Sequence, residues 1–360
     1  SRRGRRGLFD RHRHGAGTSW DNAMKRLFNK VLVTGGAGYC GSLLVPQLLS
    51  RGYQVTVFDI MFFGDHFLPK DNPAFKAVKG DIRDTALFAQ TVKGHDAVVH
   101  LACISNDASF ELDEKLSTSV NLDAFEPMVM AAKAAGVKRF IYASSSSVYG
   151  VSDKPDVTED HPLVPLTLYN KYKGMCEPLL KRHTDDNFTG VIFRPATVCG
   201  YAPRQRFDLS VNILTNHAVN ANKITVFGGS QLRPNLHVQD YCDAVELFLT
   251  APADKIQNET FNVGTQNLSL MQIAHLVRDV VSREFPEKGQ VEIVTTPSDD
   301  LRSYHINSDK IKRVLGFVPK RSIEDAVRDL CQAFRDGRLP NSMDDDQYFN
   351  VKRLRRLKAA

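Results

Sequence analysis

Two segments of the chain carry residue types that can exchange protons with a substrate. "YASSSSVYG" at 142–150 places four serines at the end of an apolar run, and "YNKYK" at 169–173 spaces Tyr169 and Lys173 by four residues. On a helix this spacing projects both side chains from the same face. A phenol with a pKa of about 10 is a poor base at neutral pH, but a neighbouring ammonium group stabilises the phenolate. Tyr169 can therefore take or give a proton at a hydroxyl group of a sugar.

A glycine-rich segment, "TGGAGYCG" at 34–41, follows a predicted strand and opens a predicted helix. Gly35, Gly38 and Gly41 let the backbone turn tightly and approach a diphosphate, and the helix N-terminus offers N–H groups to the anion. The next predicted strand ends in Asp59, 18 residues after Gly41. A carboxylate there accepts hydrogen bonds from both adenosine ribose hydroxyls and repels a ribose phosphate. This order of elements predicts NAD(H) as the cofactor.

The elements that must position these groups alternate between strands and helices. The predicted strands are "NKVLVTGG", "QVTVFD", "FKAVKGD", "AVVHLA", "KRFIYAS" and "GVIFRP". The predicted helices are "CGSLLVPQLLSRG" and the stretches 84–92, 114–135, 169–184, 237–250, 269–284, 308–315 and 322–336. Strands rich in Val, Ile and Phe between helices indicate a parallel sheet covered on both faces. The sequence predicts an α/β fold with a doubly wound parallel (Rossmann) sheet and a smaller C-terminal substrate-binding domain.

The chain divides into four predicted segments. Residues 1–23 form a basic tail outside the fold, since Met24 resembles a natural start. Residues 24–196 form the NAD-binding Rossmann domain. Residues 197–340 form the substrate domain, with segments that return to the Rossmann domain, and 341–360 form a polar and basic C-terminal tail.

Composition excludes several classes of protein. The chain has 360 residues, of which 42% are hydrophobic, so it is not disordered as a whole. It contains no apolar run near the roughly 20 residues needed to cross a bilayer, nor a hydrophobic signal core near the N-terminus. We therefore expect a soluble, cytoplasmic protein without a membrane partner. The six cysteines are widely scattered, which predicts reduced thiols and no metal site.

The net charge of +6 suggests nucleic acid binding until the charges are located. Residues 1–23 hold six arginines against two aspartates, which leaves 41 basic and 39 acidic residues in the remainder. A second basic cluster, "VKRLRRLK", lies at 351–358. Basic tails can hold phosphate backbones, but the body of the protein is nearly neutral. We do not expect a nucleic acid partner.

Together the motifs resemble those of the extended short-chain dehydrogenases/reductases, in the NAD-dependent epimerase/dehydratase family that includes UDP-glucose 4-epimerase. The resemblance covers about 24–335. It is carried jointly by "TGGAGYCG", "GDIRD" at 80–84, "HLACIS" at 100–105, "SSSSVYG", "YNKYK", "RPATVCG" at 194–200 and "LRPNLHVQD" at 232–240. It implies NAD as cofactor, a nucleotide-diphosphate sugar as substrate, and a homodimer.

The resemblance also implies site residues. Asp81 and Ile82 would contact adenine, and Asn121 would hold the region behind the catalytic helix. The implied cofactor-binding residues are Gly35, Gly38, Tyr39, Cys40, Gly41, Asp59, Asp81, Ile82, Leu101, Ala102, Cys103, Asn121, Ala143, Tyr169, Lys173 and Pro195. The implied substrate-binding residues are Ser105, Ser145, Ser146, Thr197, Arg233 and Arg302.

Two departures from the family pattern concern the substrate. Thr197 stands where many relatives have asparagine and Cys199 where many have tyrosine, so the sugar and the nucleotide stay open. Arg302 is interpreted either as a second arginine on the substrate diphosphate or as a surface arginine. The basic loop "YAPRQRFD" at 201–208 is expected to border the sugar site.

The resemblance assigns different roles to the four serines. Its catalytic Ser/Thr falls on Ser145, whose hydroxyl would bond the reacting sugar oxygen and pass a proton with Tyr169. Ser146 and Ser147 occupy the two places where the family's dehydratases put acidic residues, and a serine near neutral pH replaces neither an acid nor a base. Ser144 and Ser147 are interpreted as caps of the strand end. This pattern favours oxidation and reduction at one carbon without elimination.

The sequence therefore predicts an NAD-dependent nucleotide-sugar epimerase acting at carbon 4, with Ser145, Tyr169 and Lys173 as catalytic residues. An NAD(P)H-dependent reductase of a nucleotide-linked 4-keto sugar needs the same residues and is the alternative. A non-catalytic relative that senses NAD or binds nucleic acid is disfavoured, because the Ser/Tyr/Lys set is intact.

Overall fold

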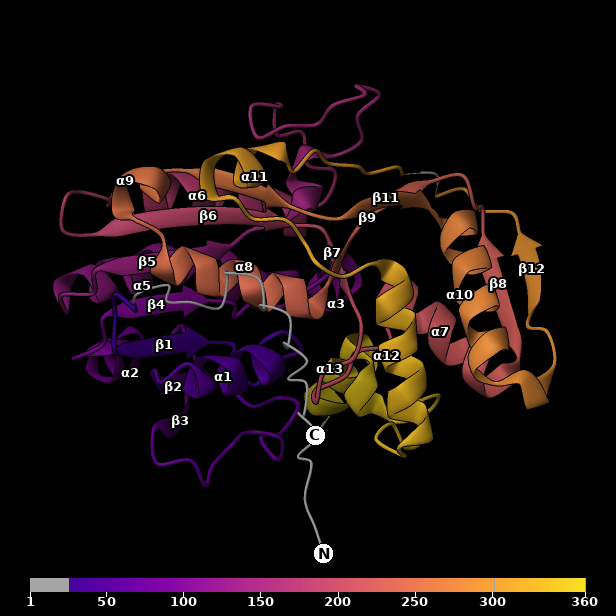
Figure 1. Cartoon of the computed structure of the whole chain (residues 1–360). Coiled ribbons are helices and arrows are strands. Elements are labelled where there is room, and N and C mark those ends of the chain that lie inside the picture. The colour runs from indigo at the N-terminus through magenta and orange to yellow at the C-terminus, as the bar shows by residue number, and fades with distance from the viewer. Residues whose placement is uncertain (1–25, 301, 360) are drawn as a thin grey trace, which may run out of the picture.

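The centre of the molecule is a seven-stranded sheet in which all neighbouring strands are parallel (Figure 1). The structure is a computed structural model and describes residues 26–300 and 302–359, so the predicted tail at 1–23 lies outside the described residues. The order across the sheet is β10-β6-β5-β4-β1-β2-β3. Its strands are β1 (Lys30–Thr34), β2 (Gln54–Asp59), β3 (Phe75–Lys79), β4 (Ala97–His100), β5 (Arg139–Ala143), β6 (Thr189–Pro195) and β10 (Thr260–Val263). The predicted doubly wound parallel sheet is confirmed.

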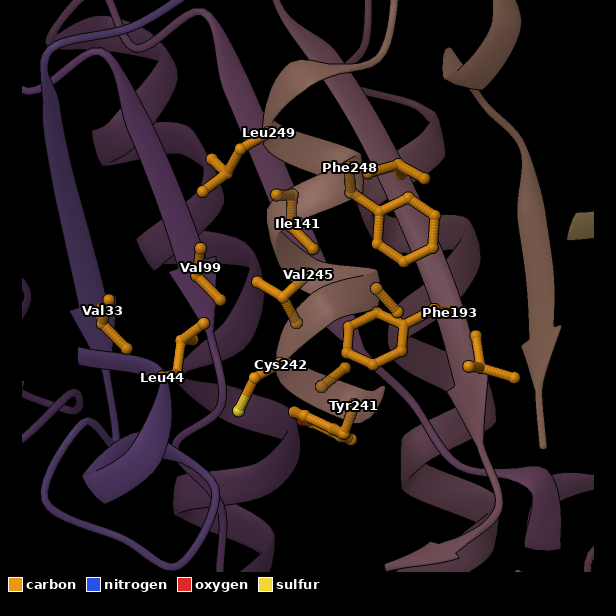
Figure 2. Packing of buried hydrophobic residues seen from close by; sticks show 14 of the residues in the cluster. Val33, Leu44, Val99, Ile141, Phe193, Tyr241, Cys242, Val245, Phe248 and Leu249 are labelled. Carbon is orange, nitrogen blue, oxygen red and sulfur yellow. The ribbon is translucent and has the colours of Figure 1, made fainter. Parts of the chain in front are cut away.

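Helices cover both faces of this sheet, which explains why its strands read as continuous apolar runs. Val31 and Val33 of β1 belong to a core cluster with side chains of α1 (Gly41–Ser50) and α8 (Val238–Thr250). Figure 2 shows Val245 and Phe248 of α8 against strand residues of that cluster. The other face packs on α2 (Thr85–Val92), α5 (Phe125–Ala134) and α6 (Leu168–Lys181).

A smaller unit stands beside the main sheet (Figure 1). Its core joins α7 (Ser210–Ala221), α10 (Leu270–Glu284) and α12 (Ile323–Arg335) to the parallel pair β8 (Lys223–Phe227) and β12 (Glu292–Thr296). A three-stranded sheet, β11-β9-β7, adjoins it, with β7 (Thr197–Cys199), β9 (Leu232–His237) and β11 (Gln266–Ser269). Two elements from this part of the chain return to the main sheet: β10 joins it as an edge strand, and α8 packs against one of its faces.

The remaining helices are short apart from the last one. They are α3 (Asp107–Glu111), α4 (Glu114–Thr118), α9 (Ala253–Ile256), α11 (Asp309–Leu315) and α13 (Asn350–Ala359). A π-helical turn spans Ser119–Asp123, and 3₁₀ turns span Ser146–Tyr149, Pro286–Lys288 and Asp346–Tyr348.

The segment 341–360, which the sequence marked only as a polar and basic tail, contains the helix α13 (yellow in Figure 1). Arg353 Nε donates to the carbonyl of Phe62 at 2.8 Å, and Arg353 also pairs with Asp346 at 3.4 Å. The contact with Phe62 fastens this strongly charged helix to the body of the protein, whereas Asp346 lies in the turn just before the helix. No helix in the described part of the chain is long and apolar enough to cross a membrane.

The sheet topology places a crevice at one edge. β1 pairs with β2 on one side and with β4 on the other, so the chain crosses to opposite sides of β1. In open α/β sheets such a reversal leaves a ligand-binding crevice beyond the carboxyl ends of the strands. The glycine loop, which follows β1, lies at this edge.

Candidate functional site

A cavity of about 380 Å³ lies at the carboxyl ends of β1, β2, β4 and β5. Most of the predicted site residues line it: Gly35, Gly38, Tyr39, Cys40, Gly41, Asp59, Asp81, Ile82, Leu101, Ala102, Cys103, Ser105, Ala143, Ser145, Tyr169, Lys173 and Thr197. Five predicted residues are not among those that line it: Asn121, Ser146, Pro195, Arg233 and Arg302. One continuous cavity thus brings together the glycine loop, the serine run and the Tyr/Lys pair.

The glycine loop has the close backbone packing that only glycine allows. Gly35 has a φ of +70°, and a Cβ atom there would lie 2.6 Å from the backbone nitrogen of Ala102. A Cβ atom on Gly41 would lie 2.5 Å from the carbonyl oxygen of Gly36. Among the described residues, no side chain caps the N-terminus of α1, and Gly41 at its start lines the cavity, so the positive end of the helix dipole lies beside it. These residues fit the diphosphate of a dinucleotide.

Asp59 joins the end of β2 to the glycine loop. Its Oδ2 accepts a hydrogen bond from the backbone N–H of Ala37 at 3.0 Å, and its Oδ1 accepts one from Met61 at 2.7 Å. Burial raises the pKa of Asp59, and these two hydrogen bonds oppose the rise. Asp59 is thereby held in the cavity wall, where it suits the hydroxyls of an adenosine ribose.

The Tyr/Lys pair lies on the first two turns of α6. The hydroxyl of Thr167 caps this helix by accepting from the N–H of Asn170 at 3.3 Å. Lys173 is buried, and its Nζ donates to the carbonyl of Ala143 at 2.8 Å and lies 6.0 Å from the centre of the Tyr169 ring. The strand end of β5 therefore fixes the ammonium beside the phenol.

Burial raises the pKa of the Tyr169 phenol well above its usual value, and the positive charge of Arg206 opposes this rise. The phenol is accordingly protonated at neutral pH in this structure. A proton can leave it or reach it only with help from positive charge nearby. Lys173 and Arg206, which both line the cavity, supply that charge.

A chain of hydrogen bonds links the serine run to α6. Ser147 Oγ donates to Asn170 Oδ1 at 2.5 Å and lies 2.6 Å from Ser145 Oγ. Because the proton of Ser147 is used by Asn170, the Ser145 hydroxyl donates to Ser147 and keeps a lone pair for another donor. Ser144 points elsewhere, since its hydroxyl donates to Glu177 Oε1 at 2.7 Å. Ser147 thus orients the hydroxyl of Ser145, whereas the hydroxyl of Ser144 stabilises the fold.

In the described part of the chain, no carboxylate lines the cavity beside Ser145 and Tyr169. Among the described residues that line it, only Asp59 and Asp81 are acidic, and both belong to the ends of β2 and β3. Within the same described residues, no group of three or more His, Cys, Asp or Glu is placed to hold a metal ion. The cavity wall around Ser145 and Tyr169 therefore offers hydroxyls and cations to a substrate. Asp107, whose negative charge acts on Tyr169, does not line the cavity and accepts from the Thr167 hydroxyl at 2.6 Å.

The two predicted substrate arginines lie together, outside the cavity wall. Arg233 Nη1 donates to the carbonyls of Leu232 and Arg302, at 2.8 Å and 2.5 Å, and its guanidinium lies 5.3 Å from the Tyr304 ring centre. Arg302 pairs with Asp300 at 2.6 Å and lies 3.9 Å from Asp107.

This arginine pair reaches the catalytic helix through Asp107. The Thr167 hydroxyl, which caps α6, donates to Asp107 Oδ1 at 2.6 Å. Arg302 is only partly exposed, with 38% of its side chain accessible. The pair therefore borders the start of α6, next to Tyr169.

Three other predicted residues act behind the cavity wall. Asn121 is buried, and its side-chain amide exchanges two hydrogen bonds with the backbone of Ile104, at 2.8 Å and 2.9 Å. Pro195 pairs with Val263 of β10 in the main sheet. Ser146 is buried in the turn after β5. Asn121 thus supports the wall segment that contains Ser105.

Several residues that line the cavity were indicated only weakly by the sequence, or not at all. Arg204 and Arg206 come from the basic loop 201–208, which the sequence placed beside the sugar site. Asn350 and Leu354 of α13 also line the cavity, and no motif indicated them. Asn350 Nδ2 donates to Ser105 Oγ at 2.9 Å, and its backbone N–H donates to Asp208 at 3.1 Å. A helix expected to be a tail thus completes the wall.

Comparison with known proteins agrees with this geometry. Residues 31–264 match the model of the NAD dependent epimerase/dehydratase family. A UDP-glucose 4-epimerase of Lactobacillus helveticus is 30% identical over 83% of this chain and 94% of its own length. A dTDP-glucose 4,6-dehydratase of Streptomyces niveus is 29% identical over 86% of this chain and 94% of its own length.

Solved structures show the same similarity. The structure of a UDP-glucose 4-epimerase from Thermotoga maritima with UDP-glucose superposes with a TM-score of 0.76 and 26% identity, covering 86% of this chain and 99% of that one. Epimerases and dehydratases therefore resemble this chain to a similar degree, and the choice between their reactions depends on the site.

Proposed function

Because the chain belongs to the NAD-dependent epimerase/dehydratase family, we propose that it is a nucleotide-sugar epimerase that inverts carbon 4 of the sugar. The observation that carries the proposal is the serine run beside Tyr169. Ser145, Ser146 and Ser147 stand there, and the acidic residues of the cavity wall lie at its other end. Elimination of water needs an acid for the leaving hydroxyl and a base for the neighbouring proton. Epimerisation needs neither.

The mechanism follows from the positions of three side chains. Tyr169 removes the proton of the C4 hydroxyl, and Lys173 favours the phenolate that makes this possible. When the sugar is bound, the Ser145 hydroxyl turns from Ser147 and donates to the same sugar oxygen. NAD, held by the glycine loop and Asp59, would supply the group that accepts the hydride from C4 and donates it again. After the 4-keto sugar has rotated in the cavity, the hydride would add to the opposite face of C4, and Tyr169 gives the proton back to the C4 oxygen.

Positioning of the substrate supplies the remainder of the rate enhancement. Arg233 and Arg302 support the proposal that the diphosphate of the sugar nucleotide is held near the start of α6, because a guanidinium fork suits phosphate oxygens. The diphosphate stays bound while the sugar rotates. We infer that Thr197 and Ser105, which line the cavity, contact the sugar itself.

The test is to incubate the protein with uridine, guanosine, cytidine and thymidine diphosphate hexoses and to separate the products by chromatography. We expect an isomer of unchanged mass from at least one of them, with no net change in absorbance at the NADH band. The reason is that an epimerase returns the hydride that it removed. The Tyr169→Phe variant is the matched control and should form the isomer far more slowly than wild type.

Two other outcomes would overturn this function. Loss of water from the sugar would show that the serine run does not prevent elimination. Consumption of one NADH for each 4-keto sugar supplied would assign the protein as a reductase. Mass spectrometry of any nucleotide sugar that copurifies would identify the base and the sugar directly.

We also propose that the protein is a homodimer that buries the exposed apolar side chains of α5, α6 and the segment before α6. These side chains are Met130, Leu163, Val164, Leu166, Leu168 and Met175, which are 36–58% exposed. α5 and α6 pack against each other, and an exposed apolar surface of this kind favours association.

Light scattering should give twice the chain mass, and the Met130→Glu/Met175→Glu variant should give the mass of one chain. A monomeric wild type would refute the proposal.

A further inference from the structure

Two arginines of the basic loop 201–208 are buried in the wall of the cofactor cavity. Arg204 is 5% exposed and Arg206 is 8% exposed. Both line the cavity together with Gly38, Tyr39 and Cys40 of the glycine loop. Arginine is rarely buried without a partner, so the surroundings of these two side chains indicate what they bind.

The basic loop is fastened directly to the start of α1. The phenol of Tyr39 donates to the carbonyl of Gly200 at 2.6 Å and accepts from Asn212 Nδ2 at 3.2 Å. The backbone N–H of Arg204 donates to Ser42 Oγ at 3.0 Å. These bonds hold the loop against the uncapped N-terminus of α1, so its two arginines flank the place that suits a diphosphate.

Two carboxylates, Asp208 and Asp59, act on Arg204 through their charge, but only Arg206 is paired directly with one of them. Arg206 Nε pairs with Asp208 at 2.8 Å, and its Nη1 donates to Ser105 Oγ at 3.3 Å. Arg204 forms no ion pair in the described part of the chain. Its Nη2 donates to the neutral Asn350 Oδ1 at 2.8 Å, and its guanidinium lies 3.5 Å from the ring centre of Phe63.

Each arginine also keeps one buried nitrogen without a hydrogen-bond partner, Nε in Arg204 and Nη2 in Arg206. Burial, and after it the positive charge of Arg206, lower the pKa of Arg204 to about 9. A buried guanidinium whose nitrogens are not all hydrogen-bonded is unfavourable, and a bound anion reduces that penalty. The unused nitrogens of both arginines, and the lack of a direct ion pair at Arg204 in the described part of the chain, indicate an anionic ligand in the cavity.

We propose that Arg204 and Arg206 bind the diphosphate of the NAD cofactor from the side opposite the glycine loop and so keep NAD bound through turnover. The proposal rests on the proposed epimerase function in one respect, since an epimerase reuses one cofactor and tight binding of NAD serves that reuse. The positions of the two arginines come from the loop and do not depend on that function. Guanidinium forks give paired, charge-assisted hydrogen bonds to phosphate oxygens.

A nucleotide sugar carries the same chemical group, so the two diphosphates must be distinguished. The cavity wall that contains Arg204 and Arg206 also contains Asp59 and the glycine loop, but neither Arg233 nor Arg302. Two separate arginine pairs therefore suit two separate diphosphates. The observations favour the cofactor for the pair in the basic loop.

The experiment measures release of NADH from the loaded protein. NADH-loaded wild type and the Arg204→Met/Arg206→Met variant are mixed with excess NAD, and loss of bound NADH fluorescence is followed. We expect release from the variant to be about 10- to 100-fold faster, the range for losing charge-assisted hydrogen bonds. Arg338→Met is the matched control. It removes an arginine that stacks on Tyr201 of the same loop at 4.9 Å but does not line the cavity, so release should be unchanged.

A second measurement identifies the diphosphate. Uridine, guanosine, cytidine and thymidine diphosphates are titrated calorimetrically into the NAD-loaded proteins. If the variant weakens one of them while NADH release stays like wild type, the arginines serve the sugar nucleotide and the proposal is overturned. It is equally overturned if neither measurement changes.

A second variant guards against misfolding, and the measured quantity does not depend on the reaction that the enzyme catalyses. If the methionine pair does not fold, the Arg204→Lys/Arg206→Lys variant decides, because it keeps both charges and loses both forks. It should release NADH faster than wild type, and a wild-type rate would contradict the proposal. NADH release does not require sugar turnover, so the result stands even if the panel of sugars reveals another reaction.

Discussion

The Tyr169→Phe variant is expected to turn over nucleotide sugar about 100- to 10,000-fold more slowly than wild type, the usual loss when a general acid–base group is removed. The phenyl ring fills the same place against Phe110, whose ring centre lies 6.4 Å from that of Tyr169. Only the hydroxyl that exchanges the proton is lost. The measurement compares kcat of the two proteins and their NADH release rates.

The matched control is Tyr172→Phe on the same helix. The Tyr172 ring also contacts Phe110, at 5.7 Å between ring centres, but it does not line the cavity. We expect its turnover to stay within a few-fold of wild type, and both variants should release NADH at the wild-type rate. Turnover by Tyr169→Phe equal to that of Tyr172→Phe would remove Tyr169 from the mechanism.

The largest loss of stability is expected from Arg194→Met, which breaks a buried ion pair behind the serine run. Arg194 of β6 bonds Glu177 of α6 through two hydrogen bonds, of 2.6 Å and 2.9 Å, and donates to the Tyr149 hydroxyl at 2.7 Å. Arg194 is 5% exposed and Glu177 is 4% exposed. Removing one partner of such a pair costs about 3–5 kcal/mol, because the other charge stays buried without compensation.

Urea unfolding followed by circular dichroism measures this loss. Arg182→Met is the matched control, because Arg182 also pairs with a glutamate, Glu126, but 57% of its side chain is exposed. Exposed pairs contribute little, so the control should unfold close to the wild-type midpoint. Equal midpoints for the two variants would show that the buried pair does not hold α6 to the sheet.

Six of the seven strands of the central sheet could be predicted from the sequence, because most of them are buried on both faces and contain few polar residues. The short strand β10 was not predicted, and the edge strand β3 is partly exposed. The stretches around Val31 and Val98 read as continuous apolar runs, and the glycine loop fixes where the first helix begins. The helix α7 could not be predicted in this way. Its inner face carries Asn212, Thr215 and Asn216, all fully buried, which removes the apolar periodicity that marks a helix.

The part of the candidate site that occurs in short motifs could be predicted from the sequence, and the part built from distant segments could not. Ser145, Tyr169 and Lys173 occur in compact motifs, so a short stretch of sequence identifies each. Asn350 belongs to no motif, because its role comes from contacts with Arg204 and Ser105 in distant parts of the chain. Local sequence patterns report local structure, and a wall formed by distant segments leaves no such pattern.

The anchoring of α13 has a kinetic consequence. Asn350 reaches Ser105 across 245 residues, and Arg353 reaches Phe62 across 291. Bringing together residues so far apart in the sequence costs loop-closure entropy before the contact contributes to stability. We therefore expect these contacts to form late in folding. A folding intermediate can therefore contain the parallel sheet and the glycine loop while the cofactor cavity is still open on one side. We therefore expect the cavity wall to be complete only in the last step, when the final helix docks.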